Sequence, residues 1–393
     1  MKNFNKPLRI AALTVPVLLL ASCNQETSSC PPVPQEAGTS LEQVARLLAA
    51  APLDLEQVRE VHDAVTASAD NGYDEEYPFR NLLETPGSGV GDDALRTRFP
   101  DTRTQAYSSP LRSLLANVAD TRAGRSGGGT PFLRELAESG LQLYWPYSED
   151  WDGKTLPVLT FHPENGRDSN VGFMRVRQAD GSWTVEEIRV DESVAARRPV
   201  WVVNRNEDAG RMTPRLHEKL NVGETAAGPV TRAGTLRSLT LKEFRSNRNF
   251  DSWFAGASEF YVKCGCIESF TASSEEELRR YHPTITDFMI VVRRRQVNKT
   301  ISFNAMLVSD WTPQLQDSAF LIVEDDGGAR TSWKCSANVK IKSKVYGFDV
   351  DLPFRTNDDI VWRGRLSNRY FETYNNIMGH FGDVNITFRI AGI

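Results

Sequence analysis

The 393-residue sequence has few cysteines, no excess of basic residues and no apolar run long enough to cross a membrane as a helix. Five cysteines are too few for a disulfide-dense scaffold. Lysine and arginine number 46 against 51 aspartate and glutamate, which argues against the basic surfaces that bind nucleic acid. The content of 40% hydrophobic and 25% charged residues excludes collagenous and wholly disordered chains. We therefore expect a globular protein without a nucleic-acid partner.

Common catalytic signatures are also missing. The segment Gly256-Ala-Ser-Glu-Phe260 lacks the second glycine of a serine-hydrolase elbow, and His217-Glu-Lys-Leu-Asn221 fails the zinc-protease pattern at its fifth position. The chain has no Walker loop and no dinucleotide-binding glycine motif after a strand. These absences favour a non-enzymatic binding or structural module.

The first 22 residues have the three parts of a secretory signal peptide: a basic segment, the apolar run 10–21 and small residues before Cys23. The run is shorter than the roughly 20 residues that a membrane-spanning helix needs. Leu20-Ala21-Ser22-Cys23 resembles the lipobox of bacterial lipoproteins, in which the cysteine thiol is diacylated and the signal peptide is then removed. The sequence therefore predicts that residues 1–22 are a lipoprotein signal peptide and that Cys23 carries the lipid.

A lipid on Cys23 implies that the membrane is a partner of the chain. Each buried methylene contributes about 0.8 kcal/mol, so the three acyl chains of a mature lipoprotein hold it on a bilayer. Asn24 stands where aspartate retains some lipoproteins in the inner membrane, which favours the outer membrane and leaves open which side it faces. Residues 23–39 are polar and proline-rich, which predicts a disordered tether.

Residues 40–140 have the pattern of several short helices. Ser40-Leu-Glu-Gln43 and Asp54-Leu-Glu-Gln57 are capping-box patterns, each followed by apolar residues at helical spacing. Ser109-Pro110 and Thr130-Pro131 predict two more helix starts, since proline suits the first helical position. We expect a helical region over residues 40–140.

The period of the apolar residues changes to two from Leu141 onward, which predicts strands. Five short β-prone runs fall within residues 141–205, and Asp180-Gly181 predicts a hairpin turn between two of them. Residues 206–235 are expected to be a connection. Nine further β-prone runs within residues 236–393 predict an antiparallel β-sandwich. The expected fold is thus mainly β, with a helical N-terminal region, a small β domain and a sandwich.

Three cysteines fall in the expected sandwich. Cys264 and Cys266 lie two residues apart on one predicted strand, so both thiols lie on the same face, and Cys335 lies in the middle of another strand. Two interpretations stand. One disulfide joins Cys335 to Cys264 or Cys266 and ties the two sheets together. Alternatively, all three are free thiols packed as small apolar side chains.

Acidic turns are the strongest signal for a ligand. Calcium takes six to eight oxygen ligands, which carboxylates on neighbouring loops supply. The candidate calcium ligands are Asp150, Asp152, Asp208, Asp325 and Asp326. The competing interpretation is that these aspartates form turns, because aspartate caps backbone amides. No other cofactor is indicated.

A metal-dependent hydrolase is the alternative function, with a site built from Glu149, Asp150, Asp152, Glu207 and Asp208. Aromatic residues beside predicted loops favour a binding role instead, because they stack on sugars or anchor protein partners. These residues are Trp145, Tyr147, Trp151, Trp253 and Phe254. Core packing is the competing interpretation of the tryptophans.

Four stretches carry a resemblance to a known family. They are Tyr144–Gly153, Val202–Asp208, Asp251–Glu259 and Glu324–Gly328. From about residue 140 to its end, and at its lipobox, the chain resembles a family of envelope lipoproteins of Bacteroides-type bacteria. The resemblance implies an envelope lipoprotein and brings no activity or catalytic residue with it. The lipobox, the loops of the β domains and the missing catalytic signatures together favour a non-enzymatic module that binds a protein or glycan partner. The sandwich with acidic loops is also similar to C2-type domains, whose paired Asp-x-Asp loops this chain lacks.

Overall fold

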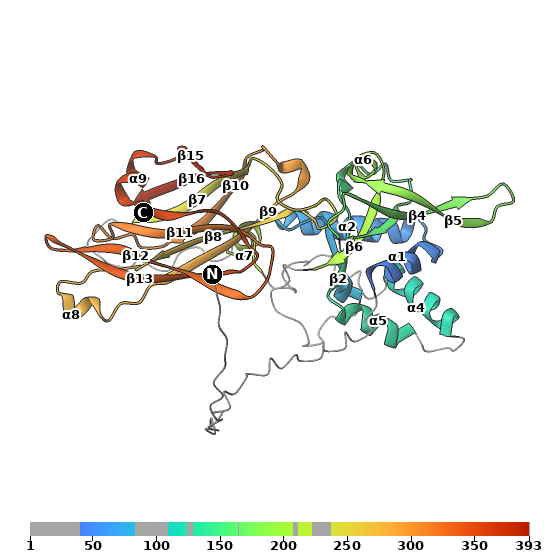
Figure 1. The fold of residues 1–393 in the computed structure, drawn as a ribbon, viewed down its shortest axis with the longest axis horizontal. Coiled ribbons are helices and arrows are strands. Elements are labelled where there is room, and N and C mark those ends of the chain that lie inside the picture. The colour runs from blue at the N-terminus through green and yellow to red at the C-terminus, as the bar shows by residue number, and fades with distance from the viewer. Residues whose placement is uncertain are drawn as a thin grey trace, which may run out of the picture. The chain divides into compact units, whose positions relative to one another are not determined.

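The structure is a computed structural model that describes residues 40–82, 109–123, 129–163, 165–206, 211–221 and 237–392. The predicted signal peptide, the tether and Cys23 lie outside the described residues. The fold class predicted from the sequence is confirmed. Strands predominate, helices occupy the N-terminal region, and antiparallel sheets form a sandwich in the C-terminal part (Figure 1).

The helices begin close to where their capping signals predict. The four longer helices of the N-terminal region are α1 (Leu41–Ala50), α2 (Leu55–Asp70), α4 (Pro110–Ala123) and α5 (Gly129–Glu138). Ser40 Oγ accepts a hydrogen bond from the Gln43 amide, and Gln43 Oε1 accepts one from the Ser40 amide, each at 3.2 Å. This reciprocal pair satisfies amides that the first helical turn leaves without partners. Asp54 caps α2 in the same way.

A six-stranded sheet follows the helices, in the order β1-β2-β6-β3-β4-β5. Its strands are β1 (Glu76–Pro78), β2 (Leu141–Tyr144), β3 (Val158–Phe161), β4 (Ser169–Arg177), β5 (Trp183–Asp191) and β6 (Val200–Arg205). Short helical turns lie between them: η1 (Phe79–Leu82), η2 (Ser148–Asp150) and α6 (Glu192–Ala195). Only the pairing of β3 with β6 is parallel among these described strands.

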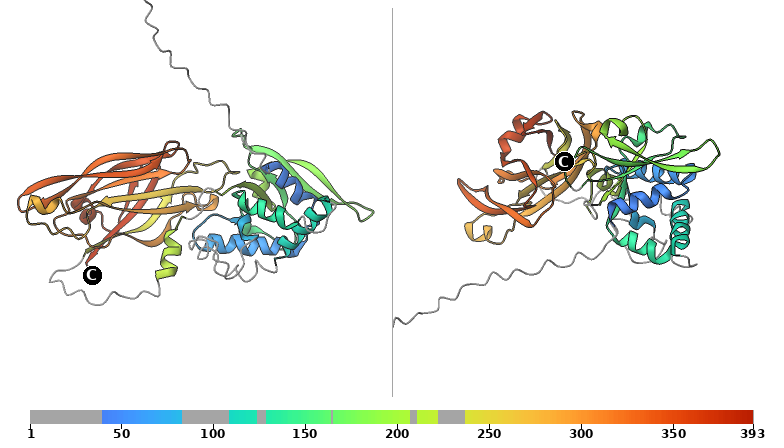
Figure 2. Two further views of the ribbon diagram at one scale, coloured as in Figure 1. Left: turned by 90° about the horizontal axis from the view of Figure 1, so that it is seen from below. Right: turned by 45° about the vertical axis from the view of Figure 1, so that its right-hand side comes forward.

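Each face of this sheet packs against a different partner. Alternation along β6 directs Trp201 and Val203 into the core shared with the helices. Val200 and Val202 point to the opposite face, where they pack with Trp253 and Phe254 from the segment before β8. Figures 1 and 2 show the helices gathered on one side of the sheet. The second face is therefore covered by part of the C-terminal half of the chain.

The sandwich contains two four-stranded antiparallel sheets, β10-β7-β16-β15 and β14-β11-β8-β9, and the separate hairpin β12-β13. The first sheet contains β7 (Arg237–Ser246), β10 (Ile301–Val308), β15 (Met378–Phe381) and β16 (Val384–Gly392). The second contains β8 (Ser258–Cys266), β9 (Thr284–Val292), β11 (Asp317–Glu324) and β14 (Asp359–Ser367). The hairpin strands are β12 (Arg330–Ile341) and β13 (Lys344–Arg355). The helical elements are α7 (Pro214–Asn221), α8 (Glu275–Leu278), η3 (Arg294–Gln296) and α9 (Asn368–Thr373).

The hairpin packs closely on strand β8. A Cβ atom built on Gly265 would lie 2.3 Å from Cγ1 of Val350 on β13, so only glycine leaves room for this approach. The hairpin therefore covers the face of β8 to which Gly265 belongs. Cys264 and Cys266 point to the other face of the same strand, because neighbouring side chains alternate.

Candidate functional site

A polar cavity of about 410 Å³ opens where the six-stranded sheet meets the sandwich. Six acidic residues line it: Asp74, Glu76, Asp251, Glu259, Asp325 and Asp326. The other polar lining residues are Gln142, His162, Asn204 and Arg205. We call this space the acidic cavity. Its volume falls within the range of small-molecule sites, and carboxyl groups dominate its wall.

The loop between α2 and β1 supplies Asp74, and Glu76 is the first residue of β1. Both side chains are buried, and Asp74 Oδ2 accepts a hydrogen bond of 2.9 Å from the amide of Ala257. Gly256 has a φ of +140°, and a Cβ atom there would lie 2.8 Å from Asp74 Oδ2. Glycine is thus required where the segment before β8 passes over this carboxylate.

Asn204, on strand β6, binds the same segment through its side chain. Its Nδ2 donates hydrogen bonds to the carbonyl oxygens of Phe254 and Ala255, at 3.2 and 2.6 Å. Trp253 Nε1 donates to the carbonyl oxygen of Asp168 at 3.0 Å. These bonds fix the wall of the cavity to which Asp251 belongs.

The end of strand β11 supplies the sandwich side of the cavity. Asp325 Oδ1 accepts hydrogen bonds from the Gly327 amide at 3.0 Å and from Arg355 Nη1 at 3.4 Å. The Asp326 amide donates to Asp358 Oδ1 at 3.3 Å. Asp325 and Asp326 therefore belong to an ordered turn, as the turn-forming interpretation predicts, and they also line the acidic cavity.

Glu324 lies buried beside the cavity wall. Its side chain has no exposed surface, and no described N–H or hydroxyl group donates a hydrogen bond to either carboxyl oxygen. Burial, together with the neighbouring Asp251 carboxyl, raises the pKa of Glu324 to about 11. Asp326 and Asp359 add negative potential in the same direction. Glu324 is therefore protonated at neutral pH.

Glu75 and Glu149 form a second pair of interacting carboxyl groups. Glu75 Oε1 accepts hydrogen bonds from the Ser148 amide at 2.9 Å and from Ser148 Oγ at 2.7 Å. Burial and the Glu149 carboxyl raise the pKa of Glu75 well above its ordinary value. Burial acts to raise the pKa of Glu149 as well, but its hydrogen bond with Glu75 and nearby arginines outweigh that effect and lower it. The proton of this pair therefore resides on Glu75.

Two arginines of η3 join the sandwich to the N-terminal sheet. Arg294 Nη1 lies 3.4 Å from Glu192 Oε1, and its Nη2 donates to the carbonyl oxygen of Asp251 at 2.8 Å. Arg295 forms ion pairs with Glu149, at 3.2 Å, and with Asp150. Through these contacts η3 is joined to η2 and α6 of the N-terminal sheet and to the segment before β8.

The calcium candidates divide between separate places. Asp150 is paired with Arg295, and Asp152 is fully exposed and accepts hydrogen bonds from Thr155 and Lys154. The bond from the Thr155 amide contributes most to lowering the pKa of Asp152 to about 2. Both residues line a different cavity, of about 130 Å³. Asp208, like Glu207 of the hydrolase hypothesis, lies outside the described residues.

No three His, Cys, Asp or Glu side chains of the described residues are arranged to hold a metal ion. The predicted calcium role of Asp150, Asp152, Asp325 and Asp326 therefore stays a prediction, and the structure places them in turns, ion pairs or cavity walls.

The three sandwich cysteines are free thiols. Cys264 and Cys266 are buried on β8, and Cys335 Sγ lies 3.7 Å from the Val350 carbonyl oxygen on the hairpin side. The hairpin covers the opposite face of β8 from the two buried thiols, so Cys335 is separated from them by the sheet. The structure holds no disulfide among these three, and the predicted pair stays a prediction.

The aromatic residues beside the predicted loops are mostly core residues. Trp145 and Phe254 have no exposed surface, Trp253 is 3% exposed, and Tyr147 and Trp151 are partly buried. Trp145 packs edge-on against both Trp151 and Trp201. The core-packing interpretation is the one that fits these side chains, and none of them lines the acidic cavity.

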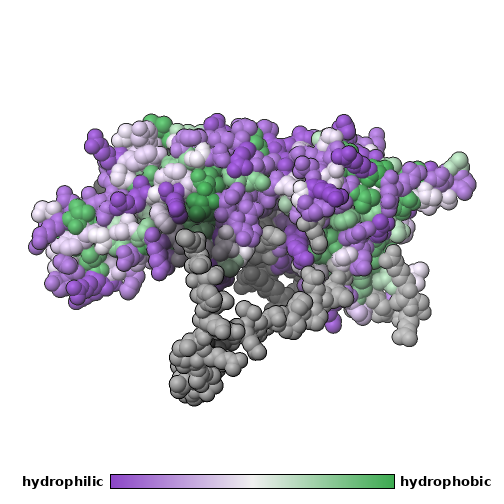
Figure 3. All heavy atoms as spheres, viewed as in Figure 1, coloured by the Kyte–Doolittle hydropathy of each residue, from purple (hydrophilic) through white to green (hydrophobic). Residues whose placement is uncertain are grey.

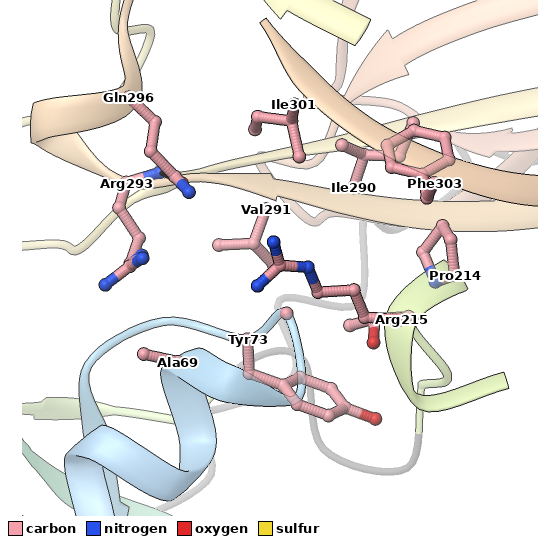
Figure 4. Close-up of a pocket in the computed structure, with 12 residues that line it drawn as sticks. Ala69, Tyr73, Pro214, Arg215, Ile290, Val291, Arg293, Gln296, Ile301 and Phe303 are labelled. Atoms are coloured by element: carbon pink, nitrogen blue, oxygen red, sulfur yellow. Dashed lines mark hydrogen bonds between the residues drawn. The ribbon is translucent and has the colours of Figure 1, made fainter. Parts of the chain in front are cut away.

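A smaller cavity lies between α2, α7 and the sandwich strands, as Figure 4 shows. The Arg215 side chain extends across it toward Val291, and its volume is about 20 Å³. That space holds about one water molecule, so this feature is a packing gap and not a ligand site.

Sequence reasoning missed the central members of the acidic cavity. Asp74 and Asp251 come from loops, Glu76 begins the three-residue strand β1, and Glu324 ends an apolar strand. The one available signal was a glutamate directly after the apolar run 319–323, where a carboxyl group becomes buried with the strand. Neither Asp74 nor Asp251 carries a pattern of its own.

Comparison with known proteins finds no matching family, no matching curated protein and no matching solved structure. Among the described residues, no helix combines the length and apolar character needed to span a bilayer.

Proposed function

We propose that the chain is a lipid-anchored protein of the bacterial outer membrane whose folded part is a non-enzymatic binding module. The anchor is the lipid on Cys23, and the lipobox together with the resemblance to envelope lipoproteins supports it. The binding site is the acidic cavity, and the partner is a protein that inserts a lysine or arginine side chain. The side of the outer membrane that the module faces is left open.

The observation that carries this proposal is the charge of the cavity wall. Among the described residues that line it, six are acidic and one, Arg205, is an arginine. A cleft with one sign of charge focuses its field and attracts ligands of the opposite sign. Hydrogen bonds between an ammonium or guanidinium group and carboxylates are also among the strongest in proteins. A cationic side chain matches this wall better than a neutral or anionic group does.

Two further observations favour a protein over a glycan. Sugar-binding sites commonly stack pyranose rings on tryptophan, tyrosine or phenylalanine, and none of these is among the described residues that line the acidic cavity. On the face shown in Figure 3, the exposed hydrophobic residues form small groups among hydrophilic ones. A polar contact centred on a charged side chain suits such a surface.

The alternative of a metal-dependent hydrolase gains no support from the described residues. Glu149 and Asp150, two of its five proposed ligands, both form ion pairs with Arg295. Asp152 is engaged by the backbone amides of its own turn.

The experiment is a calorimetric titration of the purified protein with Nα-acetyl-lysine amide, whose only charge is its ammonium group. Asp326→Asn removes one carboxylate at an exposed position of the wall and should weaken binding about fivefold, which corresponds to roughly 1 kcal/mol. Asp349→Asn makes the same charge change on the exposed hairpin, outside the cavity lining, and should leave the affinity unchanged. Equal affinities of both variants and the wild type would overturn the proposed site.

A further inference from the structure

A second cavity, of about 210 Å³, shares one wall with the acidic cavity. Asp325 lines both of them. In contrast to its neighbour, the second cavity has four basic residues in its lining: Arg211, Lys263, Arg330 and Arg355. Three aspartates accompany them, namely Asp287, Asp325 and Asp358. We call this space the basic cavity.

The aspartates of the basic cavity are already engaged. Asp287 Oδ2 lies 2.5 Å from Lys263 Nζ, and Asp325 is held by the Gly327 amide and Arg355. Asp358 Oδ2 accepts a hydrogen bond of 2.7 Å from the Arg355 amide, and its Oδ1 accepts one from the Asp326 amide. These interactions hold the three aspartates in the wall of the cavity.

Two of the guanidinium groups have no such partner. Neither Arg211 nor Arg330 forms an ion pair with any of the described residues, although Arg211 stacks over the Tyr261 ring at 5.1 Å. Arg330 stands directly opposite Arg355 in the register of β12 and β13. Like charges in that position destabilise a sheet unless an anion lies between or beside them.

The ammonium group of Lys263 adds a buried donor to these guanidiniums. Lys263 is 6% exposed on β8, with Asp287 as the acceptor of its hydrogen bond among the described residues. An ammonium group has three N–H donors, and Asp287 accepts one of them. The Tyr261 ring centre lies 4.8 Å from Nζ, so at least one N–H is left for a ligand. A buried, half-satisfied cation next to two unpaired guanidiniums is the arrangement that binds an oxyanion.

We infer that the basic cavity is a carboxylate site, and that the protein segment bound by this module carries an acidic group next to its lysine or arginine. This inference rests on the proposed function, because the carboxylate is assigned to the same protein segment whose lysine or arginine enters the acidic cavity. A singly charged carboxylate fits better than a phosphate dianion, because the four basic residues of the lining exceed its three aspartates by one charge. Tyr261, Val323, Pro353 and Phe354 give the cavity an apolar side for the carbon atoms of the ligand.

The test uses a pair of probes that differ only at the carboxyl group. N-acetylalanine presents a carboxylate, and N-acetylalanine amide replaces it with a neutral amide. Ligand-observed NMR titration should show binding of the acid and none of the amide. Arg330→Gln should weaken binding of the acid roughly tenfold or more, as expected for the loss of a charge-assisted hydrogen bond. Lys340→Gln, at an exposed position of the same strand outside the cavity, should bind as the wild type does.

Equal binding of acid and amide, or an Arg330→Gln protein that binds the acid like the wild type, would overturn the carboxylate site. Failure of the proposed function gives a different result, because it abolishes binding of Nα-acetyl-lysine amide and leaves that of N-acetylalanine intact. Two acetylated lysine peptides distinguish the source of the carboxylate. One ends in a free carboxylate, and the other has an amidated end and an internal glutamate.

Discussion

At the scale of single residues, the buried Glu324 determines how stability depends on pH. Its pKa rises from 4.5 in the unfolded chain to about 11 in the folded protein, so the folded state holds one more proton between these values. Its stabilising contribution is complete below pH 4.5, and stability then declines as pH rises toward 11. One pKa unit corresponds to 1.36 kcal/mol, and coupling to Asp251 spreads the effect over two groups.

Glu324→Gln keeps the shape of the protonated side chain and removes its titration. We predict that the variant is more stable than the wild type at pH 8 by about 1–3 kcal/mol and that its stability changes less between pH 5 and pH 9. Urea unfolding across this range measures both. Glu186→Gln, at an exposed position of β5, is the control and should follow the wild type. An unchanged pH slope in Glu324→Gln would show that this carboxyl is ionised in the folded protein.

At the scale of elements, η3 connects the sandwich to the N-terminal sheet through two arginines in different surroundings. The Arg294 side chain is 8% exposed and donates to the partly buried carbonyl oxygens of Asp251 and Gly256, whereas the Arg295 side chain is 39% exposed. We predict that Arg294→Met lowers the free energy of unfolding by about 1–3 kcal/mol, because it leaves those carbonyls unsatisfied. Arg295→Met should lower it by less than about 1 kcal/mol, as for an exposed ion pair. Chemical denaturation of both variants measures the difference, and equal losses would contradict this assignment.

The elements themselves were largely predictable from the sequence, whereas the cavity was not. Period-two alternation located the strands of both β regions, and capping residues located the helix starts. The sequence missed β1 and β15, since strands of three and four residues are too short to show a period. Asp74, Asn204, Asp251 and Asp325 come from four distant segments, and only the packing of Trp253 and Phe254 on the sheet brings them together. No local pattern encodes that docking.

At the scale of the whole molecule, the proposed lipid on Cys23 would hold the proposed binding module at a membrane. We predict that Cys23→Ala abolishes acylation, so that the variant stays in the aqueous phase or keeps its signal peptide. Detergent-phase partitioning and mass spectrometry of the N-terminal peptide measure this. Ser22→Ala, which keeps a small residue before the cysteine, is the control and should be acylated. Unchanged membrane partitioning of Cys23→Ala would contradict the lipoprotein assignment.

The central claim is that the acidic cavity selects a positive charge, and one pair of ligands tests it most directly. Nα-acetyl-lysine amide and Nα,Nε-diacetyl-lysine amide have the same backbone, but only the first carries an ammonium group. Calorimetric titration of the wild-type protein should give binding of the charged ligand, at least roughly tenfold tighter than any binding of the neutral one. Equal affinity for the two ligands, or no binding of the charged one, would contradict the account.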